Sequence, residues 1–389
     1  MTDMENWPSF DDDEIDAVVR VLRSGRVNRW TGEENQHFEE AFAEFVGADH
    51  AIALANGTVA LELPLRCSGI GPGDEVIVTS RSFVASAGAV PFVGARPVFV
   101  DVDEASQNMT AETIRDGLTD RTRAVIVVHL GGWICDMDAI MEVANERDLF
   151  VLEDCAQALG AQRNGRPAGS WGHAATWSFC QDKIMTTGGE GGMFTTDDDG
   201  LYARAWSFKD HGKNLEASRH AGPGPSFRWI HDQFGTNWRM TEMQAAIGLA
   251  ALPKVPGRVD RRIELARRLD ETLGSLSAIR ITAPPQEVRH AYYKYYAFIR
   301  PEELAHGRSR DDILAELHRR DVPAFTGICP EIYLEEAFQR MGYAPDTRLP
   351  VARRLGETAL MLPIHHRLSD ETVSRWGETV RDVITAATR

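Results

Sequence analysis

An acidic residue with suitable neighbours marks a possible binding site. Asp154 directly follows an apolar run, 149–152, that is expected to be a strand, in the segment Glu153-Asp154-Cys155-Ala156-Gln157. Ligands of open α/β sheets bind at the carboxyl ends of strands, which makes Asp154 a site candidate. An aspartate in this place can instead cap a following helix, so the motif alone leaves both roles open.

A lysine beside a glycine-rich run marks a second candidate. Lys183 precedes the segment Gly188-Gly189-Glu190-Gly191-Gly192, whose glycines predict a backbone that lies close to another group. A phosphate loop of the type G-x-x-x-x-G-K-[ST] is excluded, because the lysine comes before the glycines. A dinucleotide-binding G-x-G-x-x-G is also missing, since the nearest match, Gly71-Pro72-Gly73, precedes a predicted strand.

Pyridoxal phosphate (PLP) is the cofactor whose chemistry suits Asp154, Gln157, Ser178 and Lys183 together. A carboxylate beside the ring nitrogen keeps that nitrogen protonated, so the ring accepts the electrons released when an amino donor loses its Cα proton. A lysine amine first bonds to the cofactor and, once displaced by the donor, carries the proton as general base and acid.

Several motifs resemble those of a known family. They are Asn56-Gly57-Thr58, Ser82-Phe83-Val84-Ala85, Glu153-Asp154-Cys155-Ala156-Gln157, Ser178-Phe179 leading to Lys183, Gly189-Glu190-Gly191-Gly192, and Asn237-Trp238-Arg239-Met240-Thr241-Glu242. In this order they resemble the DegT/DnrJ/StrS family of PLP-dependent sugar aminotransferases, which have the fold-type I architecture. The resemblance extends from about Arg26 to Ile247 and is weaker towards the C-terminus.

The resemblance implies roles around the cofactor ring. Lys183 would form the Schiff base with the cofactor, and Asp154 would pair with the pyridinium nitrogen. Gln157 would contact the side of the ring that carries the hydroxyl. Phe83 would stack on the ring face.

The resemblance also implies a phosphate site shared between two subunits. Gly57, Thr58 and Ser178 would hold the phosphate, and Asn237 would reach it from the second subunit of a homodimer. Two hydroxyls and the N-terminal amides of a helix that begins at Gly57 suit an anion. Asn237 could alternatively cap the helix that follows it.

Two segments depart from the family pattern. Most members have His-Pro or a similar pair before the lysine, where this chain has Cys180-Gln181-Asp182. The usual His-Leu-Tyr-Gly is replaced by His129-Leu130-Gly131-Gly132-Trp133, in a loop that borders the substrate in the family. The loss of that tyrosine leaves the sugar specificity open, and the arrangement before the lysine also resembles the amino-hydroxybenzoate synthase and aminocyclitol branches.

The expected function is transamination. Glutamate or glutamine would donate an amino group, through the cofactor, to a keto group of a nucleotide-linked sugar or a related polyol. A PLP-dependent sugar dehydratase is an alternative, but relatives with that activity replace the lysine with histidine, and Lys183 argues against it. A regulatory protein that binds PLP without turnover is a further alternative.

Alternating strands and helices must position these residues. Strands are expected at 51–55, 75–78, 97–100, 124–129 and 149–152, and helices at 11–22, 33–46, 59–67, 82–92, 111–118 and 137–146. Alternation of this kind predicts an α/β domain with a mostly parallel sheet between helices.

A boundary near Pro253 is expected to separate two domains. Residues 1–252 would form N-terminal helices and the large PLP-binding domain, which ends in a helix over 241–252. Residues 253–389 would form a smaller α+β domain, with helices at 258–273 and 310–319, a strand at 292–299 and a final helix from Asp370.

The composition excludes several other classes of protein. The chain has 42 Lys and Arg against 58 Asp and Glu, a net charge of −16, which argues against nucleic acid or an anionic membrane as a partner. It lacks an apolar stretch long enough to span a bilayer, and its acidic start does not resemble a secretory signal, so a cytoplasmic protein is expected. Its five cysteines show no C-x-x-C pair, and no metal site is expected.

Overall fold

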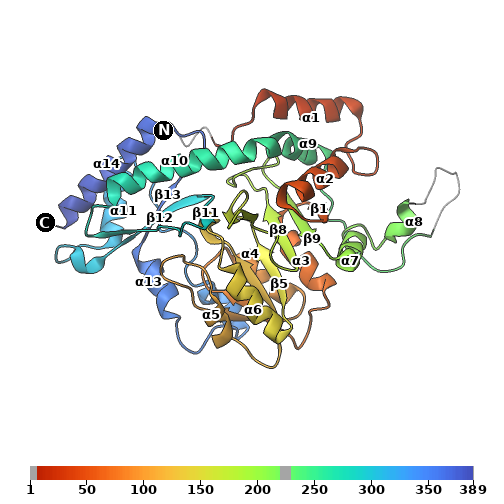
Figure 1. The fold of residues 1–389 in the computed structure, drawn as a ribbon, viewed down its shortest axis with the longest axis horizontal. Helices are drawn as coiled ribbons and strands as arrows, with labels where there is room; N and C mark the ends of the chain where they lie inside the picture. Colours follow the sequence, from red (N-terminus) through yellow and green to blue (C-terminus); the bar gives the residue numbers. More distant parts are fainter. Residues whose placement is uncertain (1–6, 220–228, 389) are drawn as a thin grey trace.

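A seven-stranded sheet forms the centre of the structure, which is a computed structural model that describes residues 7–219 and 229–388 (Figure 1). The strand order is β1-β9-β8-β5-β4-β2-β3. Its strands are β1 (His50–Leu54), β2 (Glu75–Thr79), β3 (Arg96–Val100), β4 (Thr122–Val128), β5 (Phe150–Asp154), β8 (Ala174–Ser178) and β9 (Gly192–Thr196). Only β9 is antiparallel to its neighbours within this sheet, so the predicted mostly parallel sheet is confirmed.

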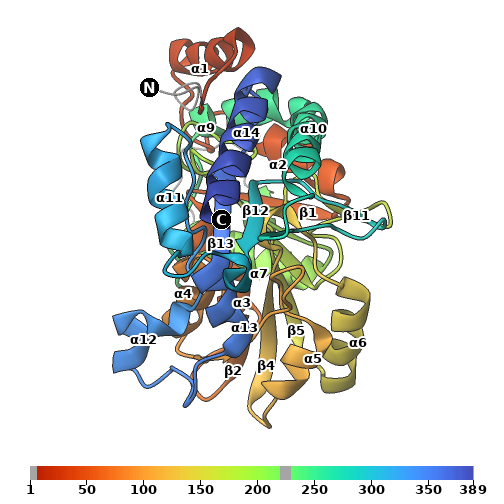
Figure 2. The same cartoon turned by 90° about the vertical axis from the view of Figure 1, so that its left-hand side faces the viewer.

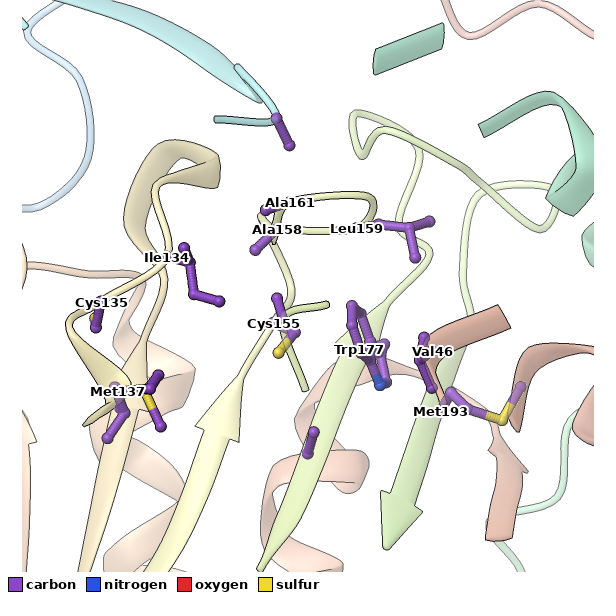
Figure 3. Packing of buried hydrophobic residues seen from close by; sticks show 14 of the residues in the cluster. Val46, Ile134, Cys135, Met137, Cys155, Ala158, Leu159, Ala161, Trp177 and Met193 are labelled. Atoms are coloured by element: carbon purple, nitrogen blue, oxygen red, sulfur yellow. The ribbon is translucent and has the colours of Figure 1, made fainter. Parts of the chain in front are cut away.

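Both faces of this sheet are buried, because alternate residues of each strand contribute to different cores. In β4, Val125 and Val127 lie in one core, whereas Ala124, Ile126 and Val128 lie in the other. Figure 3 shows part of the first core, where Trp177 and Met193 of the sheet lie near Val46.

Helices cover the two faces separately. One face packs against α2 (Glu34–Val46), α5 (Ala111–Asp116), α6 (Met137–Arg147) and α9 (Glu242–Ala251), and the other against α3 (Gly57–Cys67), α4 (Val84–Phe92) and α7 (Asp199–Lys209). Gly47 ends α2 in the left-handed conformation that a C-cap requires.

A second, antiparallel sheet forms the centre of the C-terminal part. It consists of β10 (Ile279–Ile281), β12 (Lys294–Ile299) and β13 (Ala359–Pro363), in that order. It shares a core with α10 (Val255–Leu273), α11 (Arg310–Arg319) and α14 (Asp370–Ala387). Figure 2 shows α14 between α10 and α11.

The long helix α10 connects the two parts. Val255 and Val259 belong to the core of the large sheet, whereas Leu265 and Leu269 belong to the core of the small one. The boundary near Pro253 therefore stays a prediction, because α10 contributes to both cores.

The remaining elements surround the two large sheets. They are α1 (Asp12–Ser24), α8 (Leu215–Arg219), α12 (Glu336–Arg340), α13 (Pro350–Thr358), and the short strands β6 (Gln162–Arg163), β7 (Arg166–Pro167) and β11 (Val288–Arg289), which pair as a third sheet. Over the described residues, no helix is long and apolar enough to cross a membrane.

Candidate active site

The predicted site residues lie mainly where strands end at one edge of the large sheet. Phe83 follows β2, Asp154 ends β5 and Ser178 ends β8, while Gly57 begins the helix after β1. These strands run in the same direction, so their carboxyl ends meet at one edge, where ligands of open α/β sheets bind. The structure thus brings together residues that are more than a hundred positions apart in the sequence.

Asp154 is almost fully buried, with 4% of its surface exposed. Its Oδ2 accepts a hydrogen bond from the Ser86 hydroxyl at 2.7 Å, and its Oδ1 accepts one from the Ala156 amide at 3.1 Å. Neither donor carries a positive charge, and no helix begins in residues 155–161 for Asp154 to cap. A buried carboxylate is stabilised by a cation, and a protonated ring nitrogen would be one.

Gln157 joins this segment to the loop after β4. Its buried side-chain oxygen accepts a hydrogen bond from the Gly131 amide at 2.8 Å. Gly131 has a φ of 67°, and a Cβ on it would lie 3.5 Å from the ring of Tyr296. Tyr296 of β12 therefore lies beside the position where the family has its tyrosine.

The N-terminus of α3 and the end of β8 meet in a compact corner. A Cβ on Gly57 would lie 2.7 Å from the Cβ of Ser178, so glycine lets the two segments meet. Asn56 caps the helix, because its side-chain oxygen accepts hydrogen bonds from the amides of Thr58 and Val59, each at 3.1 Å. Thr58 is exposed. A helix N-terminus flanked by two hydroxyls suits a phosphate group.

The glycine run is held against the same corner. A Cβ on Gly192 would lie 2.4 Å from the carbonyl oxygen of Asn56, and Gly188 and Gly189 have φ values of 88° and 113°. The group that the sequence predicts to lie close to this backbone is therefore the start of α3. The run returns the chain from Lys183 into β9.

The side chain of Lys183 lies against Tyr293. Its Nζ donates a hydrogen bond to the Tyr293 hydroxyl at 3.3 Å and lies 4.6 Å from the ring centroid. The Tyr293 hydroxyl in turn donates to the carboxylate of Asp182. The Tyr293 oxygen thus directs a lone pair towards the lysine amine.

Neighbouring charges and burial determine the protonation states of Asp182 and Tyr293. Burial alone would raise the pKa of Asp182, but Lys183, the Tyr293 hydroxyl and Lys294 outweigh burial and lower that pKa below its ordinary value. Burial, with Asp182 nearby, raises the pKa of Tyr293 well above its ordinary value. At neutral pH Asp182 is therefore ionised and Tyr293 keeps its proton.

Besides Thr58, two further predicted site residues have exposed side chains. Phe83 precedes α4 and has 59% of its surface exposed, although it is a large apolar residue. Asn237 is exposed in a segment that runs beside β1, where Arg239 forms a bridge with Leu54. Both side chains are accessible to another group, such as a cofactor ring or a second subunit.

Among the described residues, one buried group has side chains of metal-binding type, namely His129, Glu153 and Cys155. The carboxylate of Glu153 accepts hydrogen bonds from His129 and from the amides of Gly169, Trp171 and Gly172. The second ring nitrogen of His129 accepts one from the Cys135 amide at 3.2 Å. Burial raises the pKa of the Cys155 thiol well above its ordinary value. This group therefore fixes the strand ends through hydrogen bonds.

The side chains at this edge match what PLP requires. The buried carboxylate suits a ring nitrogen, the exposed Phe83 suits a ring face, and the corner at Gly57 suits a phosphate. Sequence reasoning missed three residues in contact with them: Ser86, Asp182 and Tyr293. Ser86 could have been found from the sequence, because its hydroxyl stands four positions after that of Ser82, with which it forms a hydrogen bond. Asp182 could have been found because it belongs to the segment before Lys183 that departs from the family pattern.

Three known proteins resemble the chain over nearly its full length. GDP-perosamine synthase of Caulobacter vibrioides is 37% identical over 95% of this chain and 94% of its own. The solved aminotransferase from Psychrobacter cryohalolentis is 46% identical, with a TM-score of 0.96 over 98% of this chain and 99% of its own. A putative sugar aminotransferase from Streptococcus pneumoniae, solved in its PLP form, is 28% identical, with a TM-score of 0.88 over 98% of each chain.

The sequence profile of one family matches residues 8–381. The match covers both the large sheet and the small one, and the expected cofactor of this family is PLP. The chain therefore belongs to the DegT/DnrJ/EryC1/StrS aminotransferase family and is a transaminase.

Proposed function

We propose that this enzyme transfers an amino group from glutamate or glutamine to the keto group of a nucleotide-linked sugar or a related polyol. The product would be an amino sugar for a surface polysaccharide or a secondary metabolite. Similarity to GDP-perosamine synthase supports a nucleotide-linked sugar as the acceptor. The replacement of the family tyrosine by Gly131 keeps an aminocyclitol or an amino-hydroxybenzoate precursor as the alternative acceptor.

The observation that supports the proposal is that Asp154 ends β5, while the segment that carries Lys183 follows β8, the strand paired in parallel with β5. PLP, when bound, supplies a carbon that takes up the donor nitrogen and a ring that accepts the electrons of the broken Cα–H bond. Asp154 would hold the proton on the ring nitrogen. The corner at Gly57, Thr58 and Ser178 would hold the phosphate.

Lys183 would move the proton in this reaction. Its amine donates a hydrogen bond to the Tyr293 hydroxyl, which in turn donates to the ionised Asp182, so the direction of the amine is fixed. A free amine at this place can remove a proton from the donor and return it elsewhere on the same face. Gln157 would lie at the hydroxyl side of the ring, and Phe83 would cover its face.

We propose that the enzyme acts as a homodimer in which Asn237 completes the phosphate site of the partner subunit. The exposure of Asn237 and of Phe234, with 99% of its surface exposed in the same segment, supports contact with a second copy. The cytoplasmic location stays a prediction.

The test is a half-reaction followed by absorbance. Glutamate or glutamine added to the PLP-loaded enzyme should change the cofactor absorbance and release the keto acid, and a matching keto sugar from a panel should reverse the change. Borohydride reduction of the resting enzyme, followed by peptide mapping, should label Lys183. The Lys183→Ala variant should still bind PLP but not turn over. Label on another lysine would overturn the site, and no response to either donor would overturn the function.

A further inference from the structure

Two consecutive hydrogen bonds connect the Lys183 amine to the wall of a cavity. Lys183 Nζ donates to the Tyr293 hydroxyl at 3.3 Å, and this hydroxyl donates to the carboxylate of Asp182. Asp182 lines a cavity of about 220 Å³, whose walls also include Arg262 of α10 and Lys294 of β12. Neither Lys183 nor Tyr293 lines the cavity, so the two hydrogen bonds are the connection between amine and cavity that the described residues show.

Tyr293 can pass a proton on while it remains neutral itself. A phenol hydroxyl both accepts and donates a hydrogen bond, so it can take up a proton on one side and release its own on the other. In Tyr293 these two sides are occupied by Lys183 and Asp182. Burial raises the pKa of Tyr293 well above its ordinary value, and Asp182 adds to that rise. The phenol is therefore neutral at pH 7, and its hydroxyl has a proton to donate.

Asp182 is the member of this row that reaches water. Its side chain has 47% of its surface exposed, and the cavity has room for several waters, since a water occupies about 30 Å³. Burial alone would raise the pKa of Asp182, but Lys183, the Tyr293 hydroxyl and Lys294 lower that pKa below its ordinary value. An ionised carboxylate can accept a proton, and a carboxylic acid with a low pKa readily gives its proton to water.

The charges around Asp182 favour release of the proton. Lys294 forms an ion pair with Asp182 at 3.5 Å, and Arg262 and His365 line the same cavity. Burial lowers the pKa of Arg262 to about 9, so its guanidinium is still protonated at pH 7. Two cations near one carboxylate stabilise its ionised form, so a proton that reaches Asp182 moves on to water.

The reaction proposed above requires a proton to leave the active site. An amino donor is an ammonium ion at neutral pH, and its nitrogen gives up protons when it bonds to carbon. A displaced lysine amine acts as a base only after it has lost the proton that makes it an ammonium ion. Lys183 therefore needs a proton acceptor that is connected to solvent.

We propose that Tyr293 and Asp182 form a proton outlet for Lys183, which leads from its amine to the water of the cavity. This inference rests on the role proposed above for Lys183. A proton on Nζ moves to the Tyr293 oxygen, the original hydroxyl proton of Tyr293 moves to the carboxylate of Asp182, and Asp182 releases it to water. Lys183 ends as a neutral amine, Tyr293 and Asp182 end as they began, and nothing is oxidised or reduced.

Chemical rescue of Asp182→Ala tests the outlet. Loss of the carboxylate should slow the donor half-reaction of the PLP-loaded enzyme by about tenfold or more, as part of the roughly 10²–10⁴ that positioned acid–base groups contribute. Formate, a small carboxylate that can enter the cavity where Asp182 lines it, should recover most of this loss. Nitrate is also flat and anionic but is too weak a base to take the proton, so it should recover less than about twofold.

Tyr293→Phe interrupts the outlet at its middle. It should slow the same half-reaction by a similar factor, and neither formate nor nitrate should restore the rate, because a phenyl ring passes no proton. Tyr292→Phe is the matched control. It removes the hydroxyl of the preceding residue, whose ring stacks on His290, and its rate should stay within about twofold of wild type.

Uptake of PLP by the cofactor-free protein gives a second readout that requires no turnover. The Lys183 amine must lose a proton before it bonds to PLP, and absorbance follows that bond. Uptake should be slow in Asp182→Ala, faster with formate and still slow with nitrate. No recovery with formate, equal recovery with nitrate, or wild-type rates in Asp182→Ala would each overturn the inference. A wild-type enzyme that responds to no donor would instead overturn the proposed function, and PLP uptake would still test the outlet.

Discussion

Asp154 is the side chain on which the proposed chemistry most directly depends. Its carboxylate is buried, and its two hydrogen bonds fix its direction without neutralising its charge. A charge held in this way is costly unless a cation meets it. Neither of its two hydrogen-bond donors is a cation, and the ring nitrogen of bound PLP would supply one.

We predict that Asp154→Asn retains PLP but loses most of the glutamate half-reaction rate, because an amide cannot hold a proton on the ring nitrogen. An electrostatic partner of this kind contributes about 2–4 kcal/mol, or about 10²–10³ in rate. Stopped-flow absorbance measures the rate. Ser86→Ala is the control, since it keeps the charge and removes one hydrogen bond worth about 1 kcal/mol, so its loss should be about fivefold or less. A loss in Asp154→Asn as small as that of the control would show that another acid has this role.

Asp182 illustrates what a departure from a family pattern can mean physically. The residue belongs to the segment Cys180-Gln181-Asp182 that stands where most family members have a histidine-proline type pair, and its ionised carboxylate accepts a hydrogen bond from the Tyr293 hydroxyl. That hydrogen bond determines which way the Tyr293 hydroxyl points, and the same hydroxyl accepts from Lys183. Asp182 and Tyr293 thereby fix the direction of the Lys183 amine.

At the level of helices and strands, α10 and β12 connect the C-terminal antiparallel sheet to this site. Lys294 begins β12, Tyr293 directly precedes it, and Arg262 of α10 donates to the carbonyl groups of Tyr292 and Tyr293 just before the strand. Further along the same two elements, the Tyr295 hydroxyl donates a hydrogen bond to Asp270 at 2.8 Å. The contact between α10 and β12 therefore bears on both stability and the position of Lys294.

We predict that Asp270→Asn stabilises the protein more at pH 8 than at pH 4.5. Burial raises the pKa of Asp270 from 3.8 to about 6. Because the folded pKa exceeds the unfolded one, the stabilisation is complete below about pH 4 and is lost as the pH rises through about 6. Asparagine keeps an acceptor for Tyr295 without the buried charge, and a gain of about 1–2 kcal/mol is expected at pH 8 after allowance for solvent screening. Scanning calorimetry at the two pH values measures it. An equal effect at both would contradict the assignment.

The elements that the sequence predicts correctly are those with a strong local pattern. The strand β4 contains the continuous apolar run 124–128 and β5 begins with the apolar run 150–152, while Gly47 marks the end of α2. The strands β8 and β9 were missed, because their sequences, AATWS and GMFTT, are short and rich in small or polar residues. They form through pairing with β1 and β5, which are distant in the sequence.

In the candidate site, too, residues in local motifs can be predicted, whereas residues brought in from distant parts of the chain cannot. Lys183 and Asp154 stand in motifs, and the sequence alone singles them out. Tyr293 and Lys294 lie about 110 positions after Lys183 and carry no motif, so only the folded chain brings them to it. The role of Gly57 required the geometry as well, because the contact with Ser178 depends on the register of β1, β9 and β8.

At the level of the whole molecule, one surface segment differs from the rest. Figure 1 shows α8 extending from the body beyond α7. In the segment that follows, Trp229 has 89% of its surface exposed and Phe234 has 99%. Asn237 lies three residues after Phe234. Large exposed aromatic side chains of this kind indicate a protein contact, and a second copy is the partner that the proposed shared site requires.

We predict that two inactive variants restore activity when mixed, because the proposed site takes Lys183 from one chain and Asn237 from the other. A hybrid dimer of Lys183→Ala and Asn237→Ala chains has one site with both defects and one with neither. Random subunit exchange should therefore recover about a quarter of the wild-type activity. Measuring exchange with differently tagged chains provides the control, and each variant exchanged with itself should stay inactive. The structure overturns the idea that Asn237 caps the helix that follows, because Thr241 caps α9 through the Gln244 amide. If Asn237 instead acts only within its own chain, the two defects lie in separate sites of the hybrid, and mixing recovers nothing. Confirmed exchange without recovery, with a severe defect in Asn237→Ala alone, would place both residues in the site of one chain.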